Sequence, residues 1–214
     1  MGKALQNKIR KRAALLESAY ELFATNGFSK TTIREIADHA GVAKGTFYLY
    51  FTDKADIRDT LITRMASSLL ENACASMEEY VSSSTEEVST ADKFVYIMDY
   101  ILQYVSADPF FVKYVSKHMS WGLLGEGQKK EQAYNPLDPE SAASVGFVTY
   151  IRNMLDADGV KVRDLKVLLF TLLGMISAFT YDLVIYQEPM PLDEFKPHMH
   201  RMIRHLVNEA IIEE

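Results

Sequence analysis

The 214-residue sequence contains a single cysteine, Cys74, so no disulfide bond can form within the chain. It also lacks an N-terminal apolar segment followed by a small-residue cleavage site. Both features argue against a small secreted domain held by disulfides and favour the reducing cytoplasm. We therefore expect a cytoplasmic protein in which Cys74 is an inert, packed thiol.

Long apolar segments are also lacking. The longest uncharged run, Val167–Tyr181, contains Gly174 and Ser177. It falls short of the roughly 20 apolar residues that span a bilayer. We interpret it as a buried helix and expect no membrane partner.

Signatures of catalysis and of metal binding are missing as well. The sequence shows no nucleophile–base arrangement, no Gly-rich phosphate loop and no paired catalytic carboxylates, so we do not expect an enzyme. His198 and His200 diverge on a helix because they are two residues apart, and no Cys, Asp or Glu completes a ligand set. We therefore expect neither a metal nor a cofactor.

Charge is present but unevenly distributed. The formal net charge of the chain is −6. The segment through residue 55 contains nine basic and five acidic residues, whereas the remainder contains 14 basic and 24 acidic residues. Only the N-terminal quarter, at +4, therefore attracts an anion. A polyanionic partner is one interpretation, and a merely solvated basic arm is the other.

The apolar residues recur with a helical period almost throughout, which predicts an all-α fold of about nine helices. The first helix is expected to end near residue 25, before the "NG" at 26–27, and a helix from Asp53 to about Tyr80 follows the short N-terminal helices. Five more helices are expected at 92–105, 108–119, 138–155, 162–186 and 191–212, with a loop at 122–136. We place a helix-turn-helix domain at 1–52 and a larger helical domain at 53–214.

Two short helices joined by a tight turn form the most informative segment. Thr32 and Glu35 fit a capping box that opens the first of them, and Gly41 permits a positive φ in the turn. Residues 43–49 provide only about two turns for the second helix. In a basic region this pattern indicates a helix-turn-helix that reads DNA.

The stretch "GVAKGTFYLYF" at 41–51 contains four aromatic rings. Phe47 and Phe51 fall one turn apart and are expected to face the core, although all four rings could be core aromatics. Lys44 is expected to bond a guanine, while tyrosine hydroxyls and Lys54 bond phosphates. The predicted DNA-binding residues are Thr32, Arg34, Ala43, Lys44, Gly45, Thr46, Tyr48, Tyr50 and Lys54.

Residues 32–57, "TIREIADHAGVAKGTFYLYFTDKADI", resemble the DNA-binding signature of the TetR (tetracycline-repressor-like) family. The sequence follows the family pattern T-x-x-x-I-A-x-x-A-G-V-x-x-G-x-x-Y-x-x-F-x-x-K-x-x-L except at its last position, where Ile57 replaces leucine. Leu49 and Tyr50 occupy positions where many family members have Tyr and His. The matching residues are Thr32, Ile36, Ala37, Ala40, Gly41, Val42, Gly45, Tyr48, Phe51 and Lys54.

This resemblance implies a homodimeric transcriptional regulator, usually a repressor that a small molecule releases from a palindromic operator. The helix at 162–186 carries a stripe of mostly small residues that would allow two subunits to approach closely, and the last helix adds an apolar face. A wholly internal helix pair is the alternative. The predicted dimer residues are Thr171, Gly174, Ala178, Asp182, Met199, Met202, Ile203 and Leu206.

A small-molecule site is predicted in the C-terminal domain, although apolar residues at helical spacing also suit a plain core. Asp99 lies opposite the apolar stripe of its helix, and we interpret it as solvated. The predicted ligand residues are Met98, Phe111, Met119, Trp121, Phe147, Tyr150, Met154, Phe170 and Phe179. Two further functions are a DNA-binding organiser that answers to a protein partner and an all-α enzyme with a chance helix-turn-helix.

Overall fold

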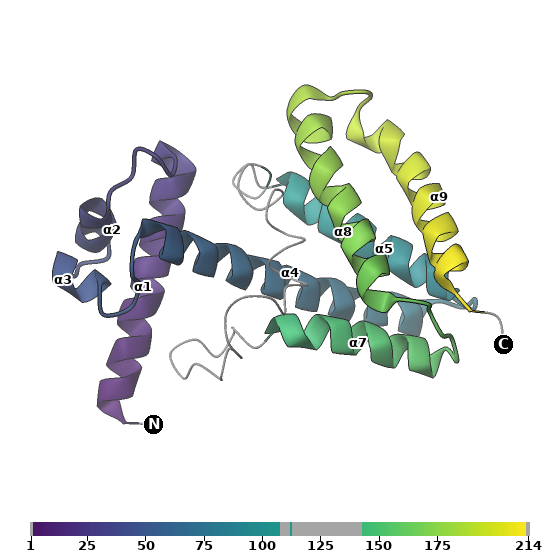
Figure 1. Ribbon diagram of the computed structural model, residues 1–214, viewed down its shortest axis with the longest axis horizontal. Helices are drawn as coiled ribbons and strands as arrows, with labels where there is room; N and C mark the ends of the chain where they lie inside the picture. Colours follow the sequence, from purple (N-terminus) through teal and green to yellow (C-terminus); the bar gives the residue numbers. More distant parts are fainter. Residues whose placement is uncertain (1, 108–111, 113–142, 213–214) are drawn as a thin grey trace. The chain divides into compact units, whose positions relative to one another are not determined.

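The computed structural model describes residues 2–107, 112 and 143–212, and the side chains of 143–146 are outside the described set. Within these ranges the chain forms eight α-helices and one π-helical turn (Figure 1). The expected helix at 108–119, apart from Val112, and the expected loop at 122–136 lie outside the described residues. An all-α fold is confirmed.

The helices are divided into two compact units. Among the described residues, one unit contains 2–65 and the other contains 66–107, 112 and 143–212. The division falls inside the fourth helix, α4 (Lys54–Ser83), so this helix contributes to both. The domain boundary predicted at 52–53 therefore stays a prediction.

The first unit is built on α1 (Lys3–Asn26), which packs against α2 (Ile33–His39). The "NG" stop predicted after α1 is confirmed, because the helix ends at Asn26 and Gly27 has a φ of 83°. On the neighbouring helix, His39 Nδ1 lies 3.2 Å from the hydroxyl of buried Ser18. This contact joins α2 to α1.

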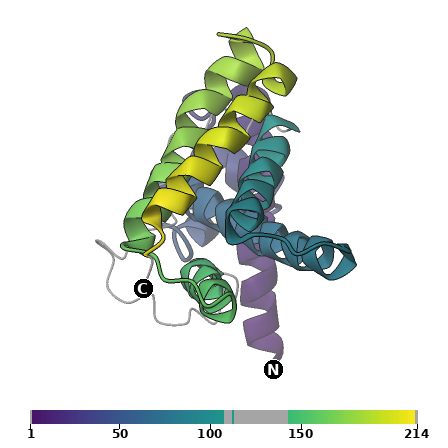
Figure 2. The ribbon, with the colours of Figure 1, turned by 90° about the vertical axis from the view of Figure 1, so that its right-hand side faces the viewer.

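The second unit has α5 (Thr90–Ala107) at its centre, packed against both α8 (Leu165–Tyr181) and α9 (Leu192–Ala210) (Figure 2). The predicted apolar stripe of α5 is confirmed as core. Its members Phe94, Ile97, Met98, Ile101, Leu102 and Val105 are all buried.

The α7 helix (Ala143–Ala157) joins this unit through its C-terminal end. The sequence "DADG" at 156–159 ends this helix, because Gly159 adopts a φ of +67° and the Val160 N–H donates to the Leu155 carbonyl at 2.9 Å. Asp158 then pairs with Lys93 and accepts from the Thr90 hydroxyl at 2.8 Å. These bonds hold the end of α7 against the start of α5.

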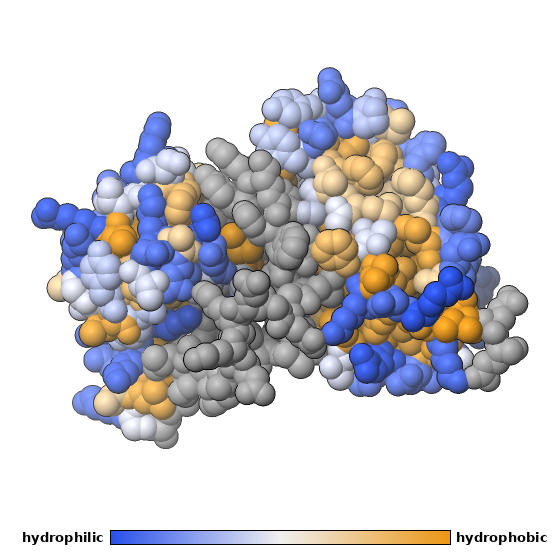
Figure 3. Space-filling model, in the orientation of Figure 1, coloured by the Kyte–Doolittle hydropathy of each residue, from blue (hydrophilic) through white to orange (hydrophobic). Residues whose placement is uncertain are grey.

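The α8 helix has two unlike faces. Leu168, Leu169, Leu172, Leu173 and Ile176 are buried in the unit. The other face is exposed, and hydrophobic side chains gather over α8 in Figure 3. By length and composition the segment Leu165–Tyr186 also suits a membrane crossing, a test that core helices of soluble proteins pass too. Within one subunit, the helix expected to be buried is therefore buried on one face only.

Candidate nucleic-acid interface

The start of α2 is fixed by its own sequence. The Thr32 N–H donates to Glu35 Oε2 at 2.7 Å, and the Glu35 N–H donates to Thr32 Oγ1 at 3.2 Å. These reciprocal bonds form the predicted capping box. The bonds from Thr32, first from its backbone N–H, lower the pKa of Glu35 below its ordinary value. The helix start is therefore stabilised as long as Glu35 stays ionised, and this contribution is lost as the pH falls through its lowered pKa.

The turn after α2 reverses the chain within a few residues. Gly41 adopts a φ of +67°, which residues with a Cβ rarely adopt. The Val42 N–H then donates to the Ala37 carbonyl at 2.9 Å. Ala37 itself is fully buried, which suits a position where two helices cross closely. The predicted helix-turn-helix geometry is thereby present.

The second helix of this motif, α3 (Lys44–Phe47), has only four residues. A helix this short does not persist alone, so packing must hold it. Phe47 and Phe51 provide that packing, because both are buried and their ring centroids lie 5.6 Å apart. The guanidinium of Arg12 on α1 lies 5.2 Å from the centroid of the Phe51 ring. The inward orientation predicted for these two phenylalanines is confirmed.

The opposite side of α3 is exposed. Ala43, Lys44 and Gly45 are exposed, and the Tyr48 side chain follows with 51% of its surface accessible. Thr46 and Tyr50 are half-buried. Leu49 was not among the predicted contact residues, but it is 78% exposed although it is apolar. Its departure from the family pattern was the signal that could have indicated it. The predicted base-reading residues thus share one accessible surface.

Lys54 requires a correction. Its Nζ donates to the carbonyl oxygens of Phe28 at 2.7 Å and Thr31 at 2.8 Å, and it lies 4.4 Å from the centroid of the Phe28 ring. Arg58 approaches the same ring at 4.8 Å. The ammonium group therefore joins the start of α4 to the α1–α2 connection instead of pointing freely at a phosphate. The phosphate contact predicted for Lys54 does not fit this geometry.

The remaining predicted DNA contacts lie around α2. The Thr32 hydroxyl uses its hydrogen on Glu35 Oε2 at 2.8 Å, so its principal role is to cap the helix. Arg34 is exposed and lies 3.7 Å from Asp38, one turn along the same helix. Such a surface pair is weak and leaves the guanidinium available. Phosphate contacts from Thr32 and Arg34 stay predictions.

The predicted ligand residues are distributed over different environments. Met98, Phe147 and Met154 are buried, and the hydroxyl of half-buried Tyr150 donates to the Cys74 carbonyl at 3.4 Å. Cys74 is buried, as expected, and burial raises the pKa of its thiol to about 12. A ligand site among these residues stays a prediction. Phe111, Met119 and Trp121 lie outside the described residues.

Phe170 and Phe179 differ from that buried group. Both are exposed on α8, with Phe170 47% accessible. Phe179 instead packs edge-on against Phe195 of α9 at 5.6 Å. A role for Phe170 and Phe179 in a ligand site stays a prediction.

The predicted dimer residues also separate into two groups. Thr171, Ala178, Asp182 and Met202 are exposed, whereas Gly174 and Leu206 are half-buried. Met199 and Ile203 are buried in the subunit itself, at the contact of α9 with α5 and α8. These two residues are corrected to core positions, because the apolar face of α9 packs first against its own chain.

Asp99 also differs from its interpretation as a solvated residue. Its carboxylate lies 3.1 Å from His200 Nε2 and 3.7 Å from Lys196 Nζ, both on α9, and its side chain is only 20% exposed. His200, which we considered as a metal ligand from the sequence, thus contacts a single carboxylate, that of Asp99. Among the residues described in 2–107, 112 and 143–212, no group of three or more His, Cys, Asp or Glu is placed to hold a metal ion.

Comparison with known proteins gives the N-terminal unit a family context. Residues 15–61 match the bacterial regulatory proteins of the tetR family. The fatty acid metabolism regulator protein of Bacillus subtilis is 37% identical over 79 residues, which are 33% of this chain and 41% of that protein. The transcriptional repressor KstR2 of Rhodococcus jostii is 27% identical over 151 residues, 63% of this chain and 74% of KstR2.

One solved structure extends the likeness to the whole fold. Thermus thermophilus FadR, a TetR-family transcriptional repressor in complex with lauroyl-CoA, superposes with a TM-score of 0.58 at 18% identity. The match covers 95% of this chain and 96% of FadR. At this identity the likeness establishes the fold alone.

Proposed function

We propose that this chain, whose residues 15–61 match the tetR family of bacterial regulatory proteins, is a repressor of that family that leaves a palindromic operator when a small molecule binds. The observation that carries the proposal is the exposed surface of α3, where Lys44 and Tyr48 are accessible while Phe47 fixes the helix from behind. A short helix held rigidly with polar side chains outward suits a major groove.

The first experiment is selection of bound duplexes from a pool of random DNA sequences by the full-length protein. We expect enrichment of an inverted repeat whose half-sites lie about 34 Å apart, one helical turn, as two symmetric subunits require. The selected duplex should bind at least 1,000-fold more tightly than random DNA at about 150 mM salt. Equal binding to all sequences would contradict the proposal.

Lys44→Ala is expected to weaken binding to the selected operator by roughly ten- to hundred-fold, because one bidentate base contact contributes about 1–3 kcal/mol of discrimination. Binding to random DNA should change much less. Titration of labelled duplexes at fixed salt measures both affinities. Lys8→Ala, on the exposed side of α1, serves as the matched control. Equal losses on both DNAs would assign Lys44 to the phosphate backbone.

We also propose a homodimer formed through the exposed side of α8. Val167, Phe170, Thr171, Gly174 and Ala178 recur at helical spacing along this side. Val167 and Phe170 are 59% and 47% exposed, an unusual amount for large apolar side chains. A partner helix laid on this stripe would approach closely at Gly174 and Ala178 and cover the larger residues.

Ala178→Glu is expected to raise the dimer dissociation constant at least 100-fold, because the dimer would bury an unpaired carboxylate. The isolated subunit should tolerate the change, since Ala178 is exposed. Sedimentation velocity across a concentration series measures the effect. Asn153→Glu, an exposed position on α7, is the control. A dimer of unchanged affinity would place the interface elsewhere.

For the effector, we propose a ligand bound among the buried apolar residues of α5 and α7, such as Met98, Phe147 and Met154. Helix α4 begins in the N-terminal unit and continues into the C-terminal one, so it offers a route from ligand to DNA. Lauroyl-CoA is the first effector to test, because FadR of Thermus thermophilus holds it in a similar fold. Release of the operator by lauroyl-CoA, with free CoA as the control, would support this class of ligand. No release would favour another small molecule or the protein partner considered above.

A further inference from the structure

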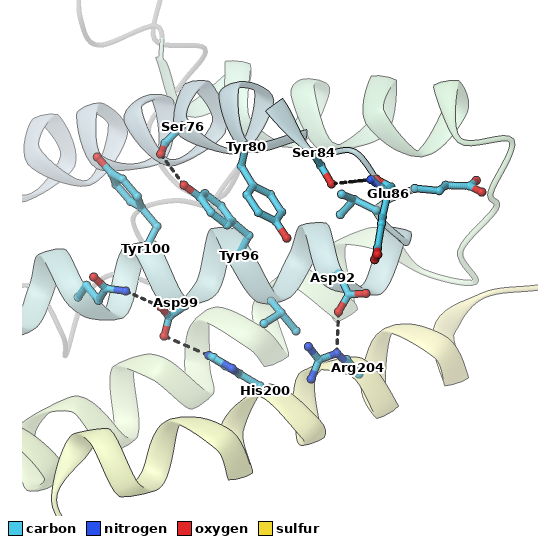
Figure 4. A pocket seen from close by; sticks show the side chains of 14 residues that line it. Ser76, Tyr80, Ser84, Glu86, Asp92, Tyr96, Asp99, Tyr100, His200 and Arg204 are labelled. Carbon is cyan, nitrogen blue, oxygen red and sulfur yellow. Dashed lines mark hydrogen bonds and ion pairs between the residues drawn. The ribbon is translucent and has the colours of Figure 1, made fainter. Parts of the chain in front are cut away.

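A cleft of about 550 Å³ opens on the C-terminal unit between the end of α4, helix α5 and helix α9 (Figure 4). All of its lining residues lie between Ser76 and Arg204, in the described part of one unit. Its volume falls in the range of about 300–1,000 Å³ that small-molecule sites occupy. None of the residues predicted for the effector lines it, so the cleft is separate from the ligand site proposed above.

One wall of the cleft is an aromatic platform formed by Tyr80 of α4 and Tyr96 of α5. Their ring centroids are 4.7 Å apart and their planes differ by 13°. A hydrogen bond of 2.8 Å between Ser76 Oγ and Tyr96 Oη fixes the inner ring. Tyr80 remains 42% exposed, and Tyr100 lines the cleft one turn further along α5. The platform is therefore held in place and still accessible.

The polar lining of the cleft is strongly acidic. Arg204 Nε donates to Asp92 Oδ1 at 2.7 Å, and His200 lies against Asp99, so both basic side chains of the lining are already engaged. Glu86 and Glu87, which follow α4, also line the cleft and form no ion pair with any residue that the structure describes. Because Asp92 is paired with Arg204, and Asp99 with His200 and Lys196, the excess negative charge of the lining comes from Glu86 and Glu87. This excess repels phosphates and carboxylates and attracts cations.

We propose that this cleft binds a small organic cation, with its apolar or aromatic body on the Tyr80–Tyr96 platform and its charged nitrogen near Glu86 and Glu87. Electron-rich tyrosine faces attract cations, and nearby carboxylates add to this attraction. A hydrated metal ion would gain little from stacked rings, and an anion would be repelled. The size of the cleft suits one small molecule better than a protein segment.

Phenyltrimethylammonium is the probe, and benzenesulfonate, with a similar ring and the opposite charge, is the control ligand. Isothermal titration of the full-length protein should show saturable binding of the cation and none of the anion. Tyr80→Ala is expected to weaken binding by about three- to thirty-fold, the range for a cation on an aromatic face. Combined Glu86→Gln and Glu87→Gln should weaken it further and reduce its dependence on salt.

Tyr186→Ala is the matched control, because Tyr186 is also an exposed tyrosine in a tyrosine pair, 5.7 Å from Tyr181, but lies outside the cleft. It should leave the binding unchanged, and thermal unfolding should confirm that each variant is folded. Equal binding of both probes, no binding of the cation, or an unchanged affinity in Tyr80→Ala would overturn the proposal. Operator selection is measured separately, so failure here leaves the regulator assignment standing.

Discussion

Replacing Lys54 by methionine is expected to lower the free energy of unfolding of the N-terminal unit by about 2–3 kcal/mol. The substitution keeps an apolar stem but removes the ammonium that bonds the Phe28 and Thr31 carbonyls. Those carbonyls would lose a charged donor, and the Phe28 ring would lose one of its two cations. Operator affinity should fall with the stability of this unit, as measured by urea unfolding and by duplex titration.

The salt dependence of DNA binding distinguishes this role from a phosphate contact. A lysine that neutralises one phosphate reduces the slope of log K against log salt by about one when it is removed, and leaves stability unchanged. We expect the reverse for Lys54→Met, with a lower unfolding midpoint and a nearly unchanged slope. Lys8→Met, at an exposed position of α1, controls for the loss of one positive charge. A reduced slope at full stability would restore the phosphate assignment.

Phe47→Ala is expected to have a larger effect, destabilising the N-terminal unit by about 3–5 kcal/mol. Phe47 is fully buried and contacts Phe51 across 5.6 Å, so its removal leaves a cavity beneath a helix of only four residues. Without that packing α3 has too few backbone bonds to persist. Circular dichroism during urea unfolding should show the loss, and specific operator binding should be abolished.

Leu49→Ala is the comparison for Phe47→Ala. Leu49 is also apolar and lies two residues away, but 78% of its side chain is exposed. Its truncation should change the stability by no more than about 0.5 kcal/mol. Equal destabilisation by the two substitutions would show that α3 is not held by Phe47.

Local features were predictable because their causes lie within a few residues. The capping box of Thr32 and Glu35 depends on a spacing of three, and the inward side of α3 follows from the spacing of Phe47 and Phe51. The stop at Gly27 likewise depends on the residue type at one position. Short-range geometry of this kind is encoded in the order of residues alone.

The errors arose where the partner is distant in the chain. Lys54 bonds carbonyls more than twenty residues earlier, and Asp99 meets His200 about a hundred residues later. The residues near Lys54 and Asp99 in the sequence form no pattern that indicates such a distant partner. Met199 was misassigned for a related reason. The sequence shows that one face of its helix is apolar, but not whether that face packs against the same chain or against a second copy. The platform tyrosines were missed for the same reason, since Tyr80 and Tyr96 lie on different helices.

The division of α3 into a buried side and an exposed side bears on how such a regulator acquires new targets. Ala43, Lys44 and Gly45 are exposed, and a Cβ built on Gly45 meets nothing within 4 Å. If these residues contact bases as proposed, substitutions there are expected to alter base contacts at little cost to the fold. After gene duplication, a few point mutations at these positions would be enough to change the DNA preference of one copy. In a laboratory library randomised at these three codons, most variants should keep the fold. The proposed function therefore predicts that target choice and structural integrity are separately mutable in this chain.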